Sequence, residues 1–279
     1  MGFFSQDGQT LVWRENQVTL WLRPWGRDGL RVQSNYTGAP LDLPQALLPG
    51  SDAAGDVQVS LGDDSASIRC GLIKATLTAQ GRLRFFNTQT GALLLEEPDR
   101  QYYTPDSRHF KPLDGRVYEI QAWFNAQEGE RFWGLGQHQH GRLDNKGCVI
   151  ELQQRNTEVT IPFAVSSRGY GFLWNNPATG RVELGLNATR WVADGSRQLD
   201  YYVVAGLTPA EILARYADVT GHAPVLPDWA AGFWQCKLRY QTQSELLSVA
   251  REYKTRGLPL SVIVADFFNW SHMGDWRFD

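Results

Sequence analysis

Apolar residues occur in short runs over most of the first 204 residues, and clusters of Gly, Asp, Asn and Pro separate these runs. The runs are rich in β-branched and aromatic residues, which favour the half-buried surface of a pleated sheet. Many short strands with turn residues between them are typical of a β-sandwich. The predicted strands are residues 10–22, 66–79, 117–124, 148–152, 171–174, 181–186 and 199–204. The polar stretch 50–57 predicts a loop or a weak boundary inside this β-rich region.

The periodicity changes from strand-like to helical after Gly206. Thr208 provides a capping hydroxyl, Pro209 suits the first helical position, and Glu211 stands three residues after the cap. Apolar residues then recur at helical spacing up to Gly221, where we expect the helix to end.

A second helix is predicted between two apolar runs near the C-terminus. Thr242 and Glu245 form another capping box, and Gly257 marks the end of the helix. The runs on either side, residues 229–236 and 260–265, have strand composition. Strand, helix and strand in this order predict a βαβ unit with two parallel, neighbouring strands. Because so small a unit leaves a sheet edge open, we expect further βα units to follow Asp279.

Composition excludes several classes of function. Hydrophobic residues make up 42% and charged residues 20% of the 279-residue chain, values typical of a globular protein and not of a disordered or membrane-spanning one. The net charge of −3 provides no broad positive field, so we expect neither nucleic acid nor a membrane as a partner. Three dispersed cysteines and the absence of an apolar leader favour a reducing, cytoplasmic location, without a disulfide framework.

The aromatic content is high, with 11 Trp, 10 Tyr and 13 Phe. Most of these side chains are expected in the core or in the sheets. Flat aromatic faces also stack on sugar rings while polar neighbours bind the hydroxyl groups. Carbohydrate is therefore the favoured class of ligand.

Asp266 is the strongest candidate for a functional side chain. It follows the apolar run 260–265 directly and precedes Phe267, Phe268 and Trp270. Ligands of parallel α/β folds bind at the carboxyl ends of strands, so a carboxylate there beside aromatic residues indicates a binding site. The alternative is an aspartate that only caps the following turn.

His138 and His140 have the spacing of paired metal ligands, but the surrounding glycines favour a loop with polar side chains. Asp144 and Cys148 are the only further ligands nearby, so no metal site is predicted. Gln139 occupies the third glycine position of a G-x-G-x-x-G motif, which argues against dinucleotide binding. No nucleophile motif of serine or cysteine hydrolases is present.

Five segments together resemble the motifs of glycoside hydrolase family 31, the retaining α-glucosidases and α-xylosidases. These segments are, in chain order, 132–137 (FWGLGQ), 166–172 (SSRGYGF), 199–202 (LDYY), 227–235 (PDWAAGFWQ) and 259–266 (PLSVIVAD). The resemblance covers roughly residues 10–279 and implies a mainly β fold. The expected domains are a galactose-mutarotase-like β-sandwich over residues 1–225 and the start of a (β/α)8 TIM barrel, truncated, over residues 226–279.

The same resemblance implies a two-step retaining displacement by two carboxyl groups. Both belong to later barrel strands, so no catalytic residue is expected before Asp279. Asp266 matches a family aspartate that holds hydroxyls of the sugar being cleaved, and Leu238 falls where many α-glucosidases have a tyrosine. The implied substrate-binding residues are Asp266, Phe268, Trp270, Trp174 and Asn175, of which Trp174 and Asn175 belong to a sandwich loop on the leaving-group side.

We therefore expect part of a glycosidase that acts on terminal α-xylosidic or α-glucosidic bonds of oligosaccharides, with a slight preference for xylosides. No cofactor is expected, and a homo-oligomer is possible for the full-length enzyme. The alternative is a non-catalytic carbohydrate-binding β-sandwich. Parallel strands with an open apolar edge argue against that alternative.

Overall fold

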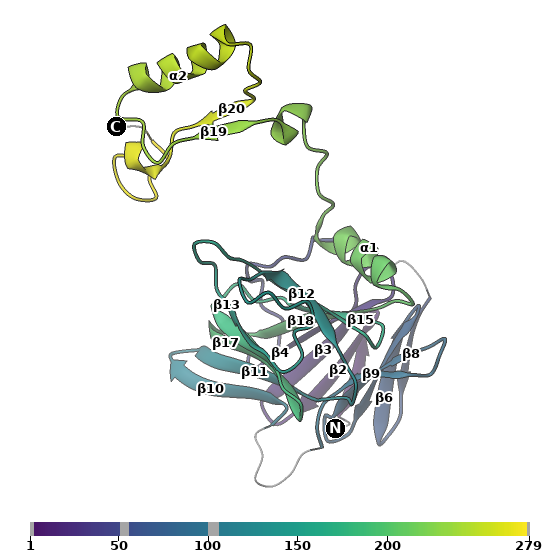
Figure 1. Ribbon diagram of the computed structural model, residues 1–279. Coiled ribbons are helices and arrows are strands. Elements are labelled where there is room, and N and C mark those ends of the chain that lie inside the picture. The colour runs from purple at the N-terminus through teal and green to yellow at the C-terminus, as the bar shows by residue number, and fades with distance from the viewer. Residues whose placement is uncertain (1–2, 51–55, 100–105, 278–279) are drawn as a thin grey trace. The chain divides into compact units, whose positions relative to one another are not determined.

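The computed structural model describes residues 3–50, 56–99 and 106–277 (Figure 1). The chain divides into two compact units, residues 1–222 and 223–279. The domain boundary predicted between residues 225 and 226 stays a prediction, and most of the predicted loop 50–57 lies outside the described residues. In the described ranges, no helix combines the length and apolarity needed to cross a membrane.

An eight-stranded antiparallel sheet forms the largest part of the first unit. Its strands, in spatial order, are β1 (Phe4–Asp7), β2 (Thr10–Glu15), β3 (Val18–Pro24), β4 (Gly29–Asn35), β18 (Leu199–Ala205), β15 (Tyr170–Trp174), β14 (Val159–Ser166) and β12 (Phe132–Gln137).

Two five-stranded antiparallel sheets complete the β structure of this unit. One has the order β10 (Arg108–Asp114), β11 (Val117–Asn125), β17 (Ala188–Ser196), β16 (Gly180–Leu184) and β13 (Val149–Leu152). The other has the order β5 (Val57–Leu61), β6 (Ser65–Cys70), β7 (Ile73–Thr78), β8 (Leu83–Asn87) and β9 (Leu93–Glu96). Every second residue of β6, β7 and β8 is buried, as expected when one face of a sheet packs on the core.

The central strands of the large sheet are covered on both faces. All residues of β4, β15 and β18 are buried. Side chains on one face, such as Val203, join the main core cluster, and side chains on the other face, such as Val204, join a smaller cluster. Helix α1 (Pro209–Thr220) supplies Ile212 and Val219 to the smaller cluster and lies over β15 and β18 (Figure 1).

Both predicted helices are confirmed, with the predicted caps. The Thr208 side chain accepts a hydrogen bond from the Glu211 amide, and α1 ends at Gly221. Helix α2 (Gln243–Thr255) has Thr242 as its cap, which accepts from the Glu245 amide. The local pattern of capping residues therefore determines where each helix begins.

The second unit contains the predicted strand–helix–strand arrangement. Strands β19 (Trp234–Cys236) and β20 (Val262–Val264) pair in parallel, with α2 between them in sequence. The predicted strand 229–236 is wrong in its first part, where Asp228–Ala231 forms the short 3-10 helix η1. A second 3-10 helix, η2, spans Phe267–Asn269.

Two predicted strands are hairpins. Residues 10–22 form β2 and β3 around a turn in which Asn16 has a φ of 54°, and residues 66–79 form parts of β6 and β7 around Gly71 with a φ of 55°. Each turn is so short that apolar residues flank it closely on both sides, and composition alone does not separate the two strands.

Candidate functional site

Asp266 lies directly beyond β20, at the carboxyl end of the parallel pair. Its Oδ1 accepts a hydrogen bond of 2.8 Å from the Phe267 amide and caps η2. Within the described ranges, no hydrogen bond or ion pair engages Oδ2. The capping role and the ligand-binding role are therefore compatible, because one carboxylate oxygen remains available to accept a hydroxyl.

Aromatic side chains stand next to Asp266 in the same loop. The rings of Phe267 and Phe268 stack with centroids 4.2 Å apart, and Phe268 is 43% exposed. The guanidinium carbon of Arg239 lies 5.4 Å from the Phe268 ring. Trp270 is half-buried, and its ring lies 5.1 Å from that of Trp276. Exposed aromatic faces of this kind suit stacking on a sugar ring.

Arg239 belongs to the loop after β19, whereas Phe268 belongs to the loop after β20. Their contact brings together the two loops at the carboxyl ends of the parallel strands. Leu238 stands in the loop after β19 and is 75% exposed. Arg239 is not among the predicted site residues, because only the fold brings this cation close to Phe268.

Trp174 and Asn175 belong to the first unit, whereas Asp266, Phe268 and Trp270 belong to the second. Trp174 ends β15 and is 1% exposed, with its ring 6.3 Å from that of Trp191. Asn175 is 4% exposed, and its Oδ1 accepts a hydrogen bond of 2.9 Å from the Ala46 amide. Both residues are therefore integrated into the sandwich, and they have little exposed surface to offer a ligand.

A pocket of about 650 Å³ adjoins Trp174 and Asn175. No charged side chain lines it, and its polar lining includes Gln153, Gln154 and Thr160. The buried Trp174 Nε1 has no hydrogen-bond partner among the described residues. An uncharged lining with a free donor suits a neutral, hydroxyl-bearing ligand better than an ion. The substrate-binding role of all five predicted residues stays a prediction.

The motif FWGLGQ forms strand β12 and not the loop that its glycines favour. Gly134, Leu135 and Gly136 all have positive φ, and the pairing with β14 shifts register between Gly134 and Gly136. The glycines therefore form a β-bulge, which bends the strand without ending it.

The two histidines after this strand are stacked, with ring centroids 5.8 Å apart. His138 Nε2 lies 2.9 Å from the Leu135 carbonyl, and its Nδ1 lies 3.8 Å from a Glu158 oxygen. The structure groups no three or more His, Cys, Asp or Glu side chains for a metal ion in the part of the chain that it describes.

Comparison with known proteins assigns both units. Residues 28–183 match the model of the glycosyl hydrolase 31 N-terminal galactose mutarotase-like domain, and residues 223–279 match that of the glycosyl hydrolases family 31 TIM-barrel domain. The fold class predicted from the sequence is thereby confirmed.

Individual relatives agree with this assignment. An uncharacterized family 31 glucosidase of Pseudescherichia vulneris is 41% identical over 100% of this chain and 56% of its own length. The crystal structure of a GH31 α-xylosidase from a soil metagenome, complexed with xylose, is 46% identical with a TM-score of 0.90, over 99% of this chain and 43% of that one. α-Xylosidase A of Aspergillus niger is 30% identical over 99% of this chain and 40% of its own length. The chain thus spans about half the length of these relatives, and it belongs to glycoside hydrolase family 31.

Proposed function

We propose that this chain is the N-terminal part of a retaining α-glycosidase that releases terminal α-linked xylose or glucose from oligosaccharides. The observation that carries the proposal is the order of parts: a family 31 sandwich, then the first parallel strands of the barrel, then Asp266 directly after β20. Active-site residues of such barrels stand at the carboxyl ends of the strands.

The proposed chemistry needs two carboxyl groups roughly 5 Å apart, one as nucleophile and one as acid/base. We expect both in barrel segments that follow residue 279 in the complete enzyme. The role of Asp266 is to bind substrate. Its Oδ2, which no described residue engages, accepts a sugar hydroxyl and holds the ring in the orientation that nucleophilic attack requires.

Phe268 and Trp270 provide apolar surface beside that carboxylate. Phe268 contacts the Phe267 ring and the Arg239 guanidinium and is still 43% exposed, so stacking a sugar on its exposed surface requires little further ordering. The relatives named α-xylosidase support xylose as the preferred sugar. We also propose a cytoplasmic location, supported by three free cysteines of which Cys236 is exposed.

The test is the variant Asp266→Asn in the complete enzyme, assayed with an aryl α-xyloside and an aryl α-glucoside. Loss of one carboxylate acceptor should lower kcat/KM by about a hundredfold, because a misplaced sugar ring reacts slowly. The thermal midpoint should stay unchanged, since Asp266 caps only one short turn. Asp228→Asn, in η1, is the matched control and should keep kcat/KM within about twofold.

Unchanged kinetics of Asp266→Asn would remove this residue from the site. The ratio of kcat/KM for the two aryl glycosides decides between xylose and glucose. If the complete protein binds oligosaccharides and turns over neither glycoside, the non-catalytic binding sandwich replaces the hydrolase proposal.

A further inference from the structure

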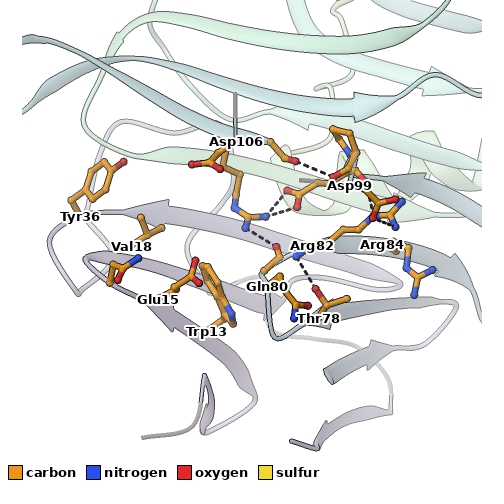
Figure 2. A pocket seen from close by; sticks show the side chains of 16 residues that line it. Trp13, Glu15, Val18, Tyr36, Thr78, Gln80, Arg82, Arg84, Asp99 and Asp106 are labelled. Atoms are coloured by element: carbon orange, nitrogen blue, oxygen red, sulfur yellow. Dashed lines mark hydrogen bonds and ion pairs between the residues drawn. The ribbon is translucent and has the colours of Figure 1, made fainter. Parts of the chain in front are cut away.

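A second pocket, of about 360 Å³, lies in the first unit and shares no residue with the one beside Trp174. Strands β2 and β3, the turn between β7 and β8, and the segments next to β9 and β10 form its walls. In Figure 2, Glu15, Trp13 and Gln80 stand along one side of the pocket, and Asp99 and Asp106 stand opposite. We call it the β2–β10 pocket.

The floor of the β2–β10 pocket is a buried ion pair. Glu97 is 1% exposed and accepts hydrogen bonds from Arg108 on both carboxylate oxygens. Burial raises the pKa of Glu97, and the adjacent Arg108 guanidinium opposes that rise. Arg108 also donates to the Gly81 carbonyl at 2.7 Å, so its side chain has one fixed position.

Trp13 supports this floor from below the guanidinium. Its Nε1 donates to the Ala79 carbonyl at 3.0 Å, and Arg108 Cζ lies 5.7 Å from its ring. A Cβ atom at Gly81 would lie 2.6 Å from the indole, so only glycine allows the turn to approach the ring this closely. The pocket is therefore preorganised before any ligand arrives.

Two donors in the lining remain unused. Arg108 Nε and Arg84 Nε are buried and have no hydrogen-bond partner among the described residues. The Arg108 side chain as a whole is 10% exposed. Unpartnered buried donors cost free energy unless a ligand or water accepts from them. The lining arginines Arg82, Arg84 and Arg108 also carry terminal guanidinium N–H groups, which suit a ligand with acceptor oxygens.

An aromatic face completes the lining. Tyr36 is 40% exposed, and its ring contacts those of Phe110 at 5.0 Å and Tyr118 at 5.6 Å. These contacts fix the ring while leaving part of its surface accessible. Such a ring can stack on the apolar face of a sugar.

Among the lining residues that the structure describes, the charges balance closely, because four carboxylates (Glu15, Glu97, Asp99, Asp106) accompany three guanidiniums (Arg82, Arg84, Arg108). Arg82 pairs with Glu96 and Asp99, and Arg108 pairs with Glu97. This arrangement provides no strong field for a phosphate or a cation, and it presents donors and acceptors side by side, as the hydroxyls of a polyol require.

We propose that the β2–β10 pocket is a second carbohydrate-binding site, which holds one or two sugar rings of a neutral oligosaccharide against Tyr36. Its volume lies at the lower end of the range of about 300–1,000 Å³ for small-molecule sites. The site is separate from the proposed catalysis: it retains the oligosaccharide on the sandwich and takes no part in bond cleavage.

Hydrogen–deuterium exchange of the complete protein, with and without a xyloglucan heptasaccharide, locates the binding. We expect the heptasaccharide to slow exchange in peptides covering residues 78–84 and 106–108. Inorganic phosphate, used as a second probe, should leave the exchange rates of these peptides unchanged.

Slower exchange in these peptides with phosphate alone would overturn the sugar assignment in favour of an anion site. If the heptasaccharide gives no protection there, the second site does not exist. Turnover assays test the hydrolase proposal separately.

Variants test the individual contacts. Tyr36→Ala and Arg84→Gln should each weaken heptasaccharide binding at this site by about tenfold, the size of one lost stacking or hydrogen-bond contact. Arg69→Gln, on the neighbouring β6 and outside the lining, should leave the affinity within about twofold. If Tyr36→Ala fails to fold, Arg84→Gln decides alone, and wild-type affinity in that variant contradicts the proposal.

Discussion

Gly136 illustrates how much a single position constrains the sandwich. Its φ is +93°, and a Cβ atom there would lie 2.0 Å from the Val159 carbonyl oxygen on the paired strand. Gly134, with a φ of +99°, approaches the Phe163 carbonyl in the same way. Both glycines are therefore required by the close approach of two strand backbones at a bulge.

Gly136→Ala should destabilise the sandwich by about 3 kcal/mol or more, because backbone strain adds to a direct clash. Gly141→Ala is the matched control: its φ is +67°, but nothing lies within 4 Å of the added Cβ. That variant should lose only about 1–2 kcal/mol. Urea unfolding of both variants measures the difference, and equal losses would show that the clash is relieved by a backbone shift.

At the scale of elements, α1 is attached to the sandwich by polar contacts as well as by its apolar face. Arg215 pairs with Asp28 at 2.8 Å and donates to the Ala205 carbonyl at 2.8 Å. The Arg215 and Asp28 side chains are 12% and 8% exposed. Asp28 also accepts from the Leu72 amide, so one carboxylate links the helix to two different sheets.

Arg215→Met should cost about 3–5 kcal/mol, because it leaves a buried carboxylate without its cation. Asp218→Ala, which removes an exposed pair between α1 and His222 just beyond its C-terminal end, should cost less than about 1 kcal/mol. Thermal unfolding at neutral pH compares the two variants. Similar midpoints would mean that Arg215 contributes little to docking α1.

At the scale of the whole chain, the two units differ in how they bury apolar residues. The first unit contains both core clusters. In the described part of the second unit, only Tyr240 is fully buried, while Leu238, Met273 and Trp276 are at least 75% exposed. Exposed apolar surface of this extent is typical of a surface that another part of a protein covers.

A polypeptide of residues 1–222 should therefore unfold cooperatively, whereas residues 223–279 alone should show no cooperative transition, since so short a segment without a buried core is marginal. Calorimetry of the two peptides checks this. The 279-residue chain by itself should aggregate readily and show no glycosidase activity. Clean turnover of an aryl α-xyloside by that chain, or a sharp transition of residues 223–279, would contradict these expectations.

Helix starts and many strands could be predicted from the sequence, because neighbouring residues along the chain determine them. Capping boxes at Thr208 and Thr242 specify the helix starts, and apolar runs predict about half of the described strands. Turns as short as that at Asn16 escaped detection, because apolar residues flank them on both sides. Strand β4 was also missed, since Arg31 and Gln33 are polar and become buried only by pairing with Asp200 of β18.

The sequence by itself determined the fold class, the helix limits and the position of Asp266 after a strand, since each depends on neighbours along the chain. Only the tertiary structure decided which aromatic residues are buried: Trp174 is enclosed, whereas Phe268 is exposed. It alone assembled the β2–β10 pocket, in which Trp13 and Arg108 lie far apart in sequence. The physical reason is that burial and convergence depend on contacts between distant segments, which no local pattern records.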